Sequence, residues 1–407
     1  MKRSLILLFI MLSLNQLMAQ DWVIINSNAG DCSFANAWFR SPDTAVLIAG
    51  FKIYRTTNGC KTFTNVFTHQ DFGGALSPLS FPSSRVGYTG GATSSGAYIT
   101  KTTDGGITWA DLPSPGGFAL NGIWFLDETT GILAGDNTIM KTVDGGTTWS
   151  DVRNGQNLPW LFSVCFADQE TGYIGGDNGC ILKTTNGGNS WLKVHTSVTT
   201  RQWLMTICSP DPNIVYAAGY TAYDSACIVK TVNGGFSWTT LRAPTKFAIN
   251  RIFFTDALTG HAACDSGIVL KTIDGGISWT TEHLWKYSVL SSISFLNDTI
   301  GFVVGTQGVV YKTINGGGPG HSSSVQNHPE EFSISPNPVT DFIRVSCQTI
   351  TPETWLTIYS HDGRIILESK ISTKVSGFNL SSFPDGLYVA VLKTSGGKIV
   401  RKFLKTS

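Results

Sequence analysis

The sequence predicts an all-β protein, a seven-bladed β-propeller of four-stranded blades followed by a small Ig-like β-sandwich. Two observations lead to this fold: a repeat that fills most of the 407 residues, and a different strand pattern in the tail. The repeat contains a short phrase made of a Lys-Thr pair, an Asp or Asn, Gly-Gly, a Ser or Thr, and a Trp. Its copies begin at Arg55, Lys101, Lys141, Lys183, Lys230, Lys271 and Lys312, at intervals of 40 to 47 residues. A period of this size is typical of propellers and other repeat arrays.

Each repeat is expected to form one blade, and residues 161–194 show this most clearly. They contain four short runs, LFSVCF, TGYIGG, CILKTT and SWLKV, in which apolar and β-branched residues dominate. Gly, Asn and Asp residues separate the runs, as in an antiparallel all-β unit. Four strands in one repeat correspond to one blade of a propeller.

The phrase itself predicts the hairpin between the third and fourth strands. Glycine reaches positive φ without steric cost, and an Asp or Asn side chain accepts hydrogen bonds from the backbone of the turn that it opens. The turn positions are Asn58, Asp104, Asp144, Asn186, Asn233, Asp274 and Asn315. Because four of these seven residues are Asn, which does not ionise, we interpret the position as structural rather than catalytic. The Trp that follows is expected to pack between blades.

These phrases resemble the Asp-box, or BNR-like, repeats of bacterial neuraminidases and sortilin-type receptors. With a second strand of the form Thr-Gly-Tyr-x-x-Gly, as at residues 171–176, they look most similar to the propeller of the photosystem II assembly and stability factor family. The resemblance spans about residues 22–316 and implies the propeller fold. It implies little about function, because one fold hosts many activities.

The seventh repeat lacks its last strand, since the chain runs from Asn315-Gly-Gly-Gly directly into Pro319. The run Asp21-Trp22-Val-Ile-Ile-Asn26 near the start of the chain reads like the missing Ser-Trp strand. We predict that this run pairs into the last blade and closes the ring, which removes an open sheet edge.

The two ends of the chain predict an exported protein. Residues 1–19 have the charged start, the short apolar run and the small residue, Ala19, of a signal peptide. The propeller is expected at 20–316, a linker at 317–331 and a second domain at 332–407. No later run is long and apolar enough to cross a bilayer, so we expect no transmembrane segment in the mature chain.

The tail contains about seven short strand-like runs in 75 residues, a pattern that favours a small β-sandwich. Its motif residues are Pro336, Asn337, Pro338, Gly363, Gly386, Tyr388 and Lys402. In this order they resemble the type A C-terminal sorting domain of the type IX secretion system. The resemblance implies the type IX machinery as a partner, and a secreted or cell-surface location reached through the periplasm and the outer membrane.

Composition excludes several classes of function. The formal net charge is +1 and only 14% of residues are charged, without the basic stripe that nucleic-acid binding needs. The seven histidines show no metal-ligand spacing, so we expect no metal and no cofactor. The eight cysteines lie singly along the chain, which favours buried thiols over a framework of disulfides.

A ligand is expected on the face that carries the turns between second and third strands and the links between blades, because variable loops on a rigid scaffold usually carry function. The candidates there are Phe118, Trp160, Arg201, Trp203, Tyr223, Phe247, Arg251, Trp285 and Tyr287. Aromatic side chains suit sugar stacking and protein hot spots, and the arginines suit an acidic group. The alternative is that most of these aromatics pack against the neighbouring blade.

The sequence favours a non-enzymatic propeller that binds a protein or a glycan at the cell surface or outside the cell. A glycan hydrolase, similar to sialidases or xyloglucanases, and a passive surface scaffold are the alternatives. Hydrolysis needs two carboxylates that face each other. The glutamates of the propeller are only Glu128, Glu170 and Glu282, and no residue is assigned a catalytic role.

Overall fold

The computed structural model describes residues 21–26, 32–70, 76–94, 96–195, 201–223, 225–284, 288–317, 332–335, 339–347, 354–360, 365–394 and 397–405. These residues form strands, turns and two short 3₁₀ turns, η1 (Asp265–Gly267) and η2 (Thr306–Gly308). The chain divides into two compact units between residues 321 and 322.

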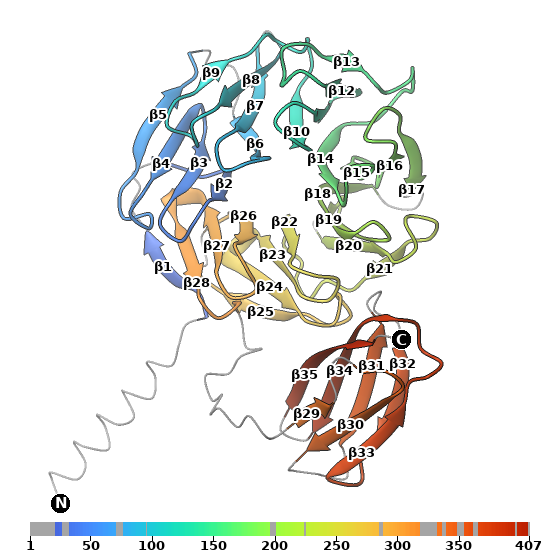
Figure 1. Cartoon of the computed structure of the whole chain (residues 1–407). Helices are drawn as coiled ribbons and strands as arrows, with labels where there is room; N and C mark the ends of the chain where they lie inside the picture. Colours follow the sequence, from blue (N-terminus) through green and yellow to red (C-terminus); the bar gives the residue numbers. More distant parts are fainter. Residues whose placement is uncertain are drawn as a thin grey trace, which may run out of the picture. The chain divides into compact units, whose positions relative to one another are not determined.

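The first unit is a seven-bladed propeller, and Figure 1 shows its seven four-stranded sheets around one axis. Blades one to three contain β2 (Asn36–Phe39), β3 (Ala45–Ala49), β4 (Lys52–Thr56) and β5 (Thr64–Thr68); β6 (Leu76–Ser80), β7 (Gly87–Thr93), β8 (Gly96–Thr102) and β9 (Ala110–Asp111); and β10 (Leu120–Phe125), β11 (Gly131–Gly135), β12 (Thr138–Thr142) and β13 (Ser150–Asp151).

Blades four to six contain β14 (Leu161–Phe166), β15 (Thr171–Gly176), β16 (Ile181–Thr185) and β17 (Leu192–His195); β18 (Gln202–Asp211), β19 (Ile214–Thr221), β20 (Ala226–Thr231) and β21 (Thr239–Leu241); and β22 (Ile249–Phe254), β23 (Gly260–Cys264), β24 (Ile268–Thr272) and β25 (Thr280–His283). Every residue of the second strands β3, β11, β23 and β27 (Gly301–Gly305) is buried, because neighbouring blades cover both faces of each sheet.

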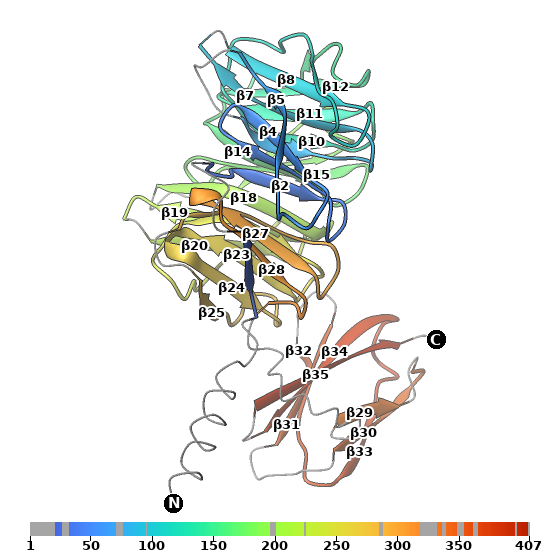
Figure 2. The same cartoon turned by 90° about the vertical axis from the view of Figure 1, so that its left-hand side faces the viewer.

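The seventh blade closes the ring with the N-terminal strand, as predicted. Its strand order is β26 (Leu290–Phe295), β27, β28 (Val310–Thr313) and β1 (Val23–Asn26). Val23 lies opposite Lys312 in the β1–β28 pair, and Trp22 is only 1% exposed. The side-chain amide of Asn315 donates to Asp21 Oδ1 over 2.9 Å. Figures 1 and 2 show the first blade beside this last one.

Each phrase folds into the same hydrogen-bonded turn whether it carries Asp or Asn. The Thr102 hydroxyl donates to Asp104 Oδ1 over 2.8 Å and accepts the Gly106 N–H over 2.9 Å. At the Asn186 turn, the Thr184 hydroxyl donates to Asn186 Oδ1 over the same 2.8 Å. Although partial burial raises it, the hydrogen bonds from Thr108, Thr102 and Ile107 bring the pKa of Asp104 down to about 2. A carboxyl group held in this ionised state is unsuited to acid catalysis.

In four of the seven phrases the Lys side chain donates a hydrogen bond to the next blade. The ammonium groups of Lys141 and Lys183 donate to the carbonyl oxygens of Gly187 and Gly234, each over 2.8 Å, and Lys230 donates to Gly275 O over 3.1 Å. These glycines belong to the phrase of the following blade. The lysines therefore connect neighbouring blades in one direction around the ring.

Replacing Lys183 by Met is expected to lower the free energy of unfolding by about 1–2 kcal/mol, because the buried carbonyl of Gly234 loses its donor. Lys193→Met is the matched control, since Lys193 is exposed on β17. Chemical denaturation of both variants would check this, and equal stability of the two would contradict the proposed contact.

We call the β1–β28 pairing that closes the ring the seam. A carboxyl group near the seam has a perturbed pKa. Burial, followed by the nearby carboxylate of Asp21, raises the pKa of Glu282 on β25 to about 7, while the Trp22 N–H and Lys271 oppose this shift. One oxygen of Glu282 has no hydrogen-bond partner within the described part of the chain. The folded state therefore favours protonated Glu282.

Stability is expected to decrease as the pH rises from below 4.5, the ordinary pKa of Glu282, through about 7, because ionisation then opposes folding. Glu282→Gln should remove this contribution: its melting temperature should exceed that of the wild type at pH 8 and match it near pH 5. Calorimetry at both pH values measures these melting temperatures. The expectation is wrong if the difference in melting temperature between the two proteins is the same at both pH values.

The second unit is a β-sandwich of a three-stranded and a four-stranded sheet. The strand orders are β29 (Phe332–Ser335), β30 (Phe342–Cys347), β33 (Val375–Asn379), and β32 (Ile365–Lys370), β31 (Trp355–Ser360), β34 (Gly386–Thr394), β35 (Gly397–Lys405). Val345, Leu356 and Phe403 belong to its buried core.

The structure describes three of the predicted tail motif residues. Gly386 begins β34 with φ of 154°, which favours glycine, and Lys402 lies on β35. Tyr388 is buried, and its hydroxyl donates to Pro384 O over 2.7 Å. Pro336, Asn337, Pro338 and Gly363 lie outside the described residues.

All eight cysteines are free thiols, and six of them are buried. No group of three or more His, Cys, Asp or Glu side chains that could hold a metal ion occurs among the described residues. The same part of the chain contains no helix long and apolar enough to span a membrane.

Candidate ligand-binding face

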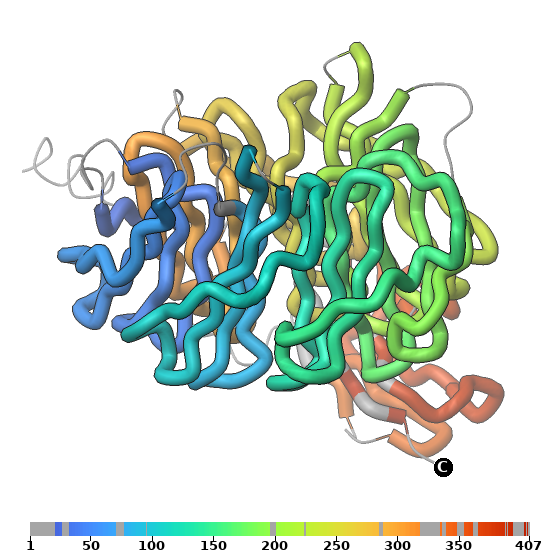
Figure 3. Tube along the Cα trace, turned by 90° about the horizontal axis from the view of Figure 1, so that it is seen from above, coloured from blue at the N-terminus to red at the C-terminus, as the bar shows by residue number. Residues whose placement is uncertain are grey.

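The propeller has two different faces because its strands alternate in direction. The tight Asp-box hairpins lie on one face. The turns between second and third strands and the links between blades lie on the other, which we call the loop face. Figure 3 shows the yellow-green segment near residue 220 projecting beyond the strands of its blade. The loop face is therefore extended at the β19–β20 turn of the fifth blade.

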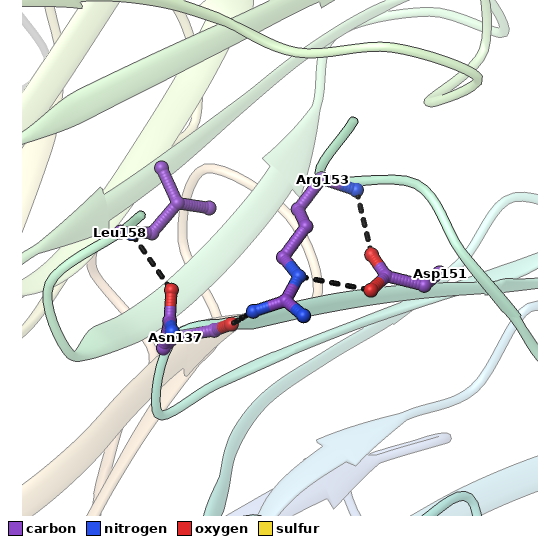
Figure 4. Close-up of polar contacts among 4 residues, drawn as sticks. All are labelled: Asn137, Asp151, Arg153 and Leu158. Carbon is purple, nitrogen blue, oxygen red and sulfur yellow. Dashed lines mark hydrogen bonds and ion pairs between the residues drawn. The ribbon is translucent and has the colours of Figure 1, made fainter. Parts of the chain in front are cut away.

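Trp160 stands at the end of a firmly held loop between β13 and β14. The Arg153 guanidinium donates to Asp151 Oδ2 over 2.9 Å and to the backbone oxygen of Asn137 over 2.8 Å (Figure 4). The side chain of Asn137, a residue with φ of 47°, accepts the Leu158 N–H over 2.7 Å. Trp160 itself is 55% exposed. An aromatic side chain on such a loop loses little conformational freedom when it binds.

Arg201, Trp203 and Tyr220 form a stack beside Trp160. The Arg201 guanidinium carbon lies 4.9 Å from the centre of the Trp203 ring, and the Tyr220 ring stacks on Trp203 with centroids 5.0 Å apart. Arg201 Nη2 also lies 3.4 Å from Asp177 Oδ2, and the Asp177 N–H donates to the carbonyl oxygen of Trp160 over 2.7 Å. Asp177 thus links the stack to the Trp160 loop.

Tyr223 extends the group at the tip of the β19–β20 turn, where it is 78% exposed. The N–H of the preceding residue, Ala222, donates to the carbonyl oxygen of Arg201 over 3.0 Å. We call Trp160, Arg201, Trp203, Tyr220 and Tyr223 the aromatic strip. Its accessible parts are Trp160, Tyr223 and the Arg201 side chain, which is 58% exposed, because Trp203 is already covered by its two neighbours.

The other predicted candidates lie elsewhere. Phe118 and Phe247 are partly buried and pack against the hydrophobic clusters between blades. Arg251 lies on β22 and lines a cavity on the propeller axis rather than the rim. Trp285 and Tyr287 lie outside the described residues. Within the described part, the aromatic strip therefore brings together four of the nine predicted ligand-binding candidates, Trp160, Arg201, Trp203 and Tyr223.

Sequence reasoning missed Tyr220, although the repeat carries a signal for it. Tyr220 follows Gly219 at the end of a second strand, where Asp136, Asp177 and Asp265 stand in other blades. A change from Asp to Tyr at this one position replaces a turn-forming side chain with a ring that stacks on Trp203.

Three carboxylates on this face are engaged with neighbouring polar side chains. Asp151 pairs with Arg153, Asp177 accepts from Arg201, and Asp265 Oδ1 accepts the side-chain amide of Asn250 over 2.8 Å. In these arrangements the three carboxylates hold neighbouring side chains in place.

Comparisons with known proteins agree with this architecture. Residues 115–200 match the family model of the photosynthesis system II assembly factor YCF48, and residues 333–406 match that of the secretion system C-terminal sorting domain. A search of curated protein sequences found no match.

Three solved structures are similar in fold. YCF48 bound to a D1 peptide gives a TM-score of 0.59 at 16% identity, covering 74% of this chain and 98% of that one. YCF48 from Cyanidioschyzon merolae gives 0.55 at 18% identity, with 72% and 98% covered. The GH74 enzyme of Niastella koreensis gives 0.58 at 15% identity, with 94% and 74% covered. The chain is therefore a β-propeller with repeats similar to those of YCF48, followed by a secretion system C-terminal sorting domain.

Proposed function

We propose that the protein is exported through the type IX route and that its propeller is a non-enzymatic module that binds a protein at the cell surface or outside the cell. The observation that carries this proposal is the aromatic strip. Exposed Trp160 and Tyr223 stand near the exposed guanidinium of Arg201 on one face. Trp, Tyr and Arg are the residues that dominate binding energy at protein interfaces.

The side chains of the aromatic strip are held in fixed positions, which supports binding of a preformed partner surface. Hydrogen bonds fix the Trp160 loop, and Asp177 fixes Arg201 relative to it. Side chains held in this way lose little entropy on association, so more of the contact energy appears as affinity. YCF48, whose propeller has a similar fold, has been solved with a bound peptide.

The contacts made by three acids of the loop face favour binding over hydrolysis. A glycosidase needs two opposed carboxyl groups about 5–10 Å apart with a sugar between them. Asp151, Asp177 and Asp265 instead hold loops through Arg153, Arg201 and Asn250. The covered face of Trp203 also reduces the flat aromatic surface that a sugar ring would need.

The tail supports export to the cell surface or beyond, since residues 333–406 match a sorting domain. We further propose that residues 1–19 are a cleaved signal peptide and that residues 317–331 link the propeller at 20–316 to the sorting domain at 332–407. N-terminal sequencing of the secreted protein tests the first boundary, which requires a start at Gln20.

A displayed random-peptide library selected on the full chain tests the binding proposal. Peptides should be retained by the wild type and by Phe236→Ser, which removes a 93% exposed aromatic from a hairpin on the opposite face. They should be lost with Trp160→Ala and Tyr223→Ala. A glycan array with a reducing-sugar assay in parallel separates the alternatives: glycan binding without peptide binding, or release of sugar, would overturn the proposal.

A further inference from the structure

A cavity of about 330 Å³ lies on the axis of the propeller. Residues of all seven blades line it, and they come from the first strands or a directly adjoining residue: Ala35 and β2, β6 and Phe81, then β10, β14, β18, β22 and β26. Its volume is at the lower end of the range for small-molecule sites. It is distinct from the aromatic strip, none of whose residues lines it.

Arg251 is the charged residue among the described residues that line this cavity. No carboxylate of the described chain forms an ion pair with it. Arg251 is partly buried, and this burial lowers the pKa of its guanidinium. A cation that has lost part of its water is stabilised by an anion or by hydrogen-bond acceptors.

The titratable groups nearest to Arg251 do not supply that anion. These groups are the thiols of Cys165 on β14 and Cys208 on β18. Burial raises the pKa of both thiols, so both are neutral at physiological pH. The positive charge of Arg251 is therefore not neutralised by its own surroundings.

The polar residues of the wall are largely engaged with each other. The side-chain amides of Asn36, Asn121 and Asn250 donate to the carbonyl oxygens of Ser77, Leu161 and Leu290 in the following blade, over 3.1, 3.0 and 3.0 Å. These bonds hold the side-chain amides of the wall in place. The Arg251 guanidinium donates no hydrogen bond within the described part of the chain, and its planar fork of N–H groups is of the kind that suits a carboxylate.

We infer that the axial cavity is a binding site for a small organic carboxylate, with Arg251 as its receptor. The guanidinium fork matches the two oxygens of a carboxylate, and a narrow cavity with one sign of charge concentrates the attraction. The volume limits the ligand to a small acid. The inference does not depend on the proposed role of the aromatic strip.

Isothermal titration calorimetry on the full chain, with acetate and succinate as probes and succinamide as the neutral counterpart, tests the inference. The acids should bind and the diamide should not. Arg251→Met should weaken acid binding at least 10-fold, whereas Arg251→Lys, which keeps the charge but not the fork, should weaken it less. Arg85→Met, which removes an exposed charge before β7, and Arg201→Met should bind like the wild type.

Ser291→Asp provides a second test that keeps Arg251. This change puts a carboxylate on the neighbouring first strand β26, in the wall of the same cavity. The new carboxylate should pair with the Arg251 guanidinium and thereby abolish the binding of added acids. Failure of the wild type to bind either acid, equal binding of acid and diamide, or unchanged binding by Arg251→Met or Ser291→Asp would each overturn the inference. Peptide selection on the aromatic strip would be unaffected by any of these results.

Discussion

Replacing Trp22 by alanine is expected to lower the free energy of unfolding by about 3–5 kcal/mol, the usual cost of removing a buried aromatic ring. Trp22 is 1% exposed, packs edge-on against Phe295 at 5.8 Å, and anchors β1 in the last blade. For a domain of this size the melting temperature should fall by roughly 10 °C. Differential scanning calorimetry of the full chain measures this change.

Val23→Ala is the control for the closing strand, because Val23 lies on β1 but is 51% exposed. Its melting temperature should stay close to that of the wild type, as for most surface substitutions. If Trp22→Ala and Val23→Ala had the same melting temperature, the stability of the ring would not depend on the Trp22 contact.

Removing residues 332–407 is expected to abolish passage across the outer membrane, so that the protein accumulates in the periplasm. The deleted segment contains the sorting domain matched at residues 333–406. The propeller has its own buried core and is a separate compact unit, so the truncated chain should remain folded. Cell fractionation followed by immunoblotting measures the distribution of the truncated and the intact protein.

Val375→Ala is the matched control for the tail, because Val375 lies on β33 of the second unit, is 52% exposed and is not one of the motif residues. Export of this variant should continue. Appearance of the truncated protein outside the cell in normal amounts would contradict the role assigned to the tail.

The repeat made the propeller and its closure predictable from sequence. The seven phrases define the blades, and the missing strand after Asn315 together with Trp22 points to β1 in the last sheet. Local patterns suffice here because each blade is a contiguous chain segment apart from that one strand.

The contacts between blades could not be predicted in the same way. The lysines of the phrase recur in the sequence, but Lys101, Lys141, Lys183 and Lys230 donate to residues 44 to 51 positions later, beyond the reach of any local pattern. The candidate ligand-binding face was predicted only in part, and the reason is similar. Which aromatics are packed, as Phe118 is, and which are exposed, as Trp160 is, depends on the neighbouring blade.

The hydrogen bond between Asn315 and Asp21 places both ends of the propeller in the same blade. The six other blades are each continuous chain, so neither terminus gives direct access to them. Peeling from either end must first separate β1 from β28, and the lifetime of the folded ring outside the cell is then governed by the opening rate of this single sheet. A protease that trims the chain from its ends meets the seam before any other part of the propeller.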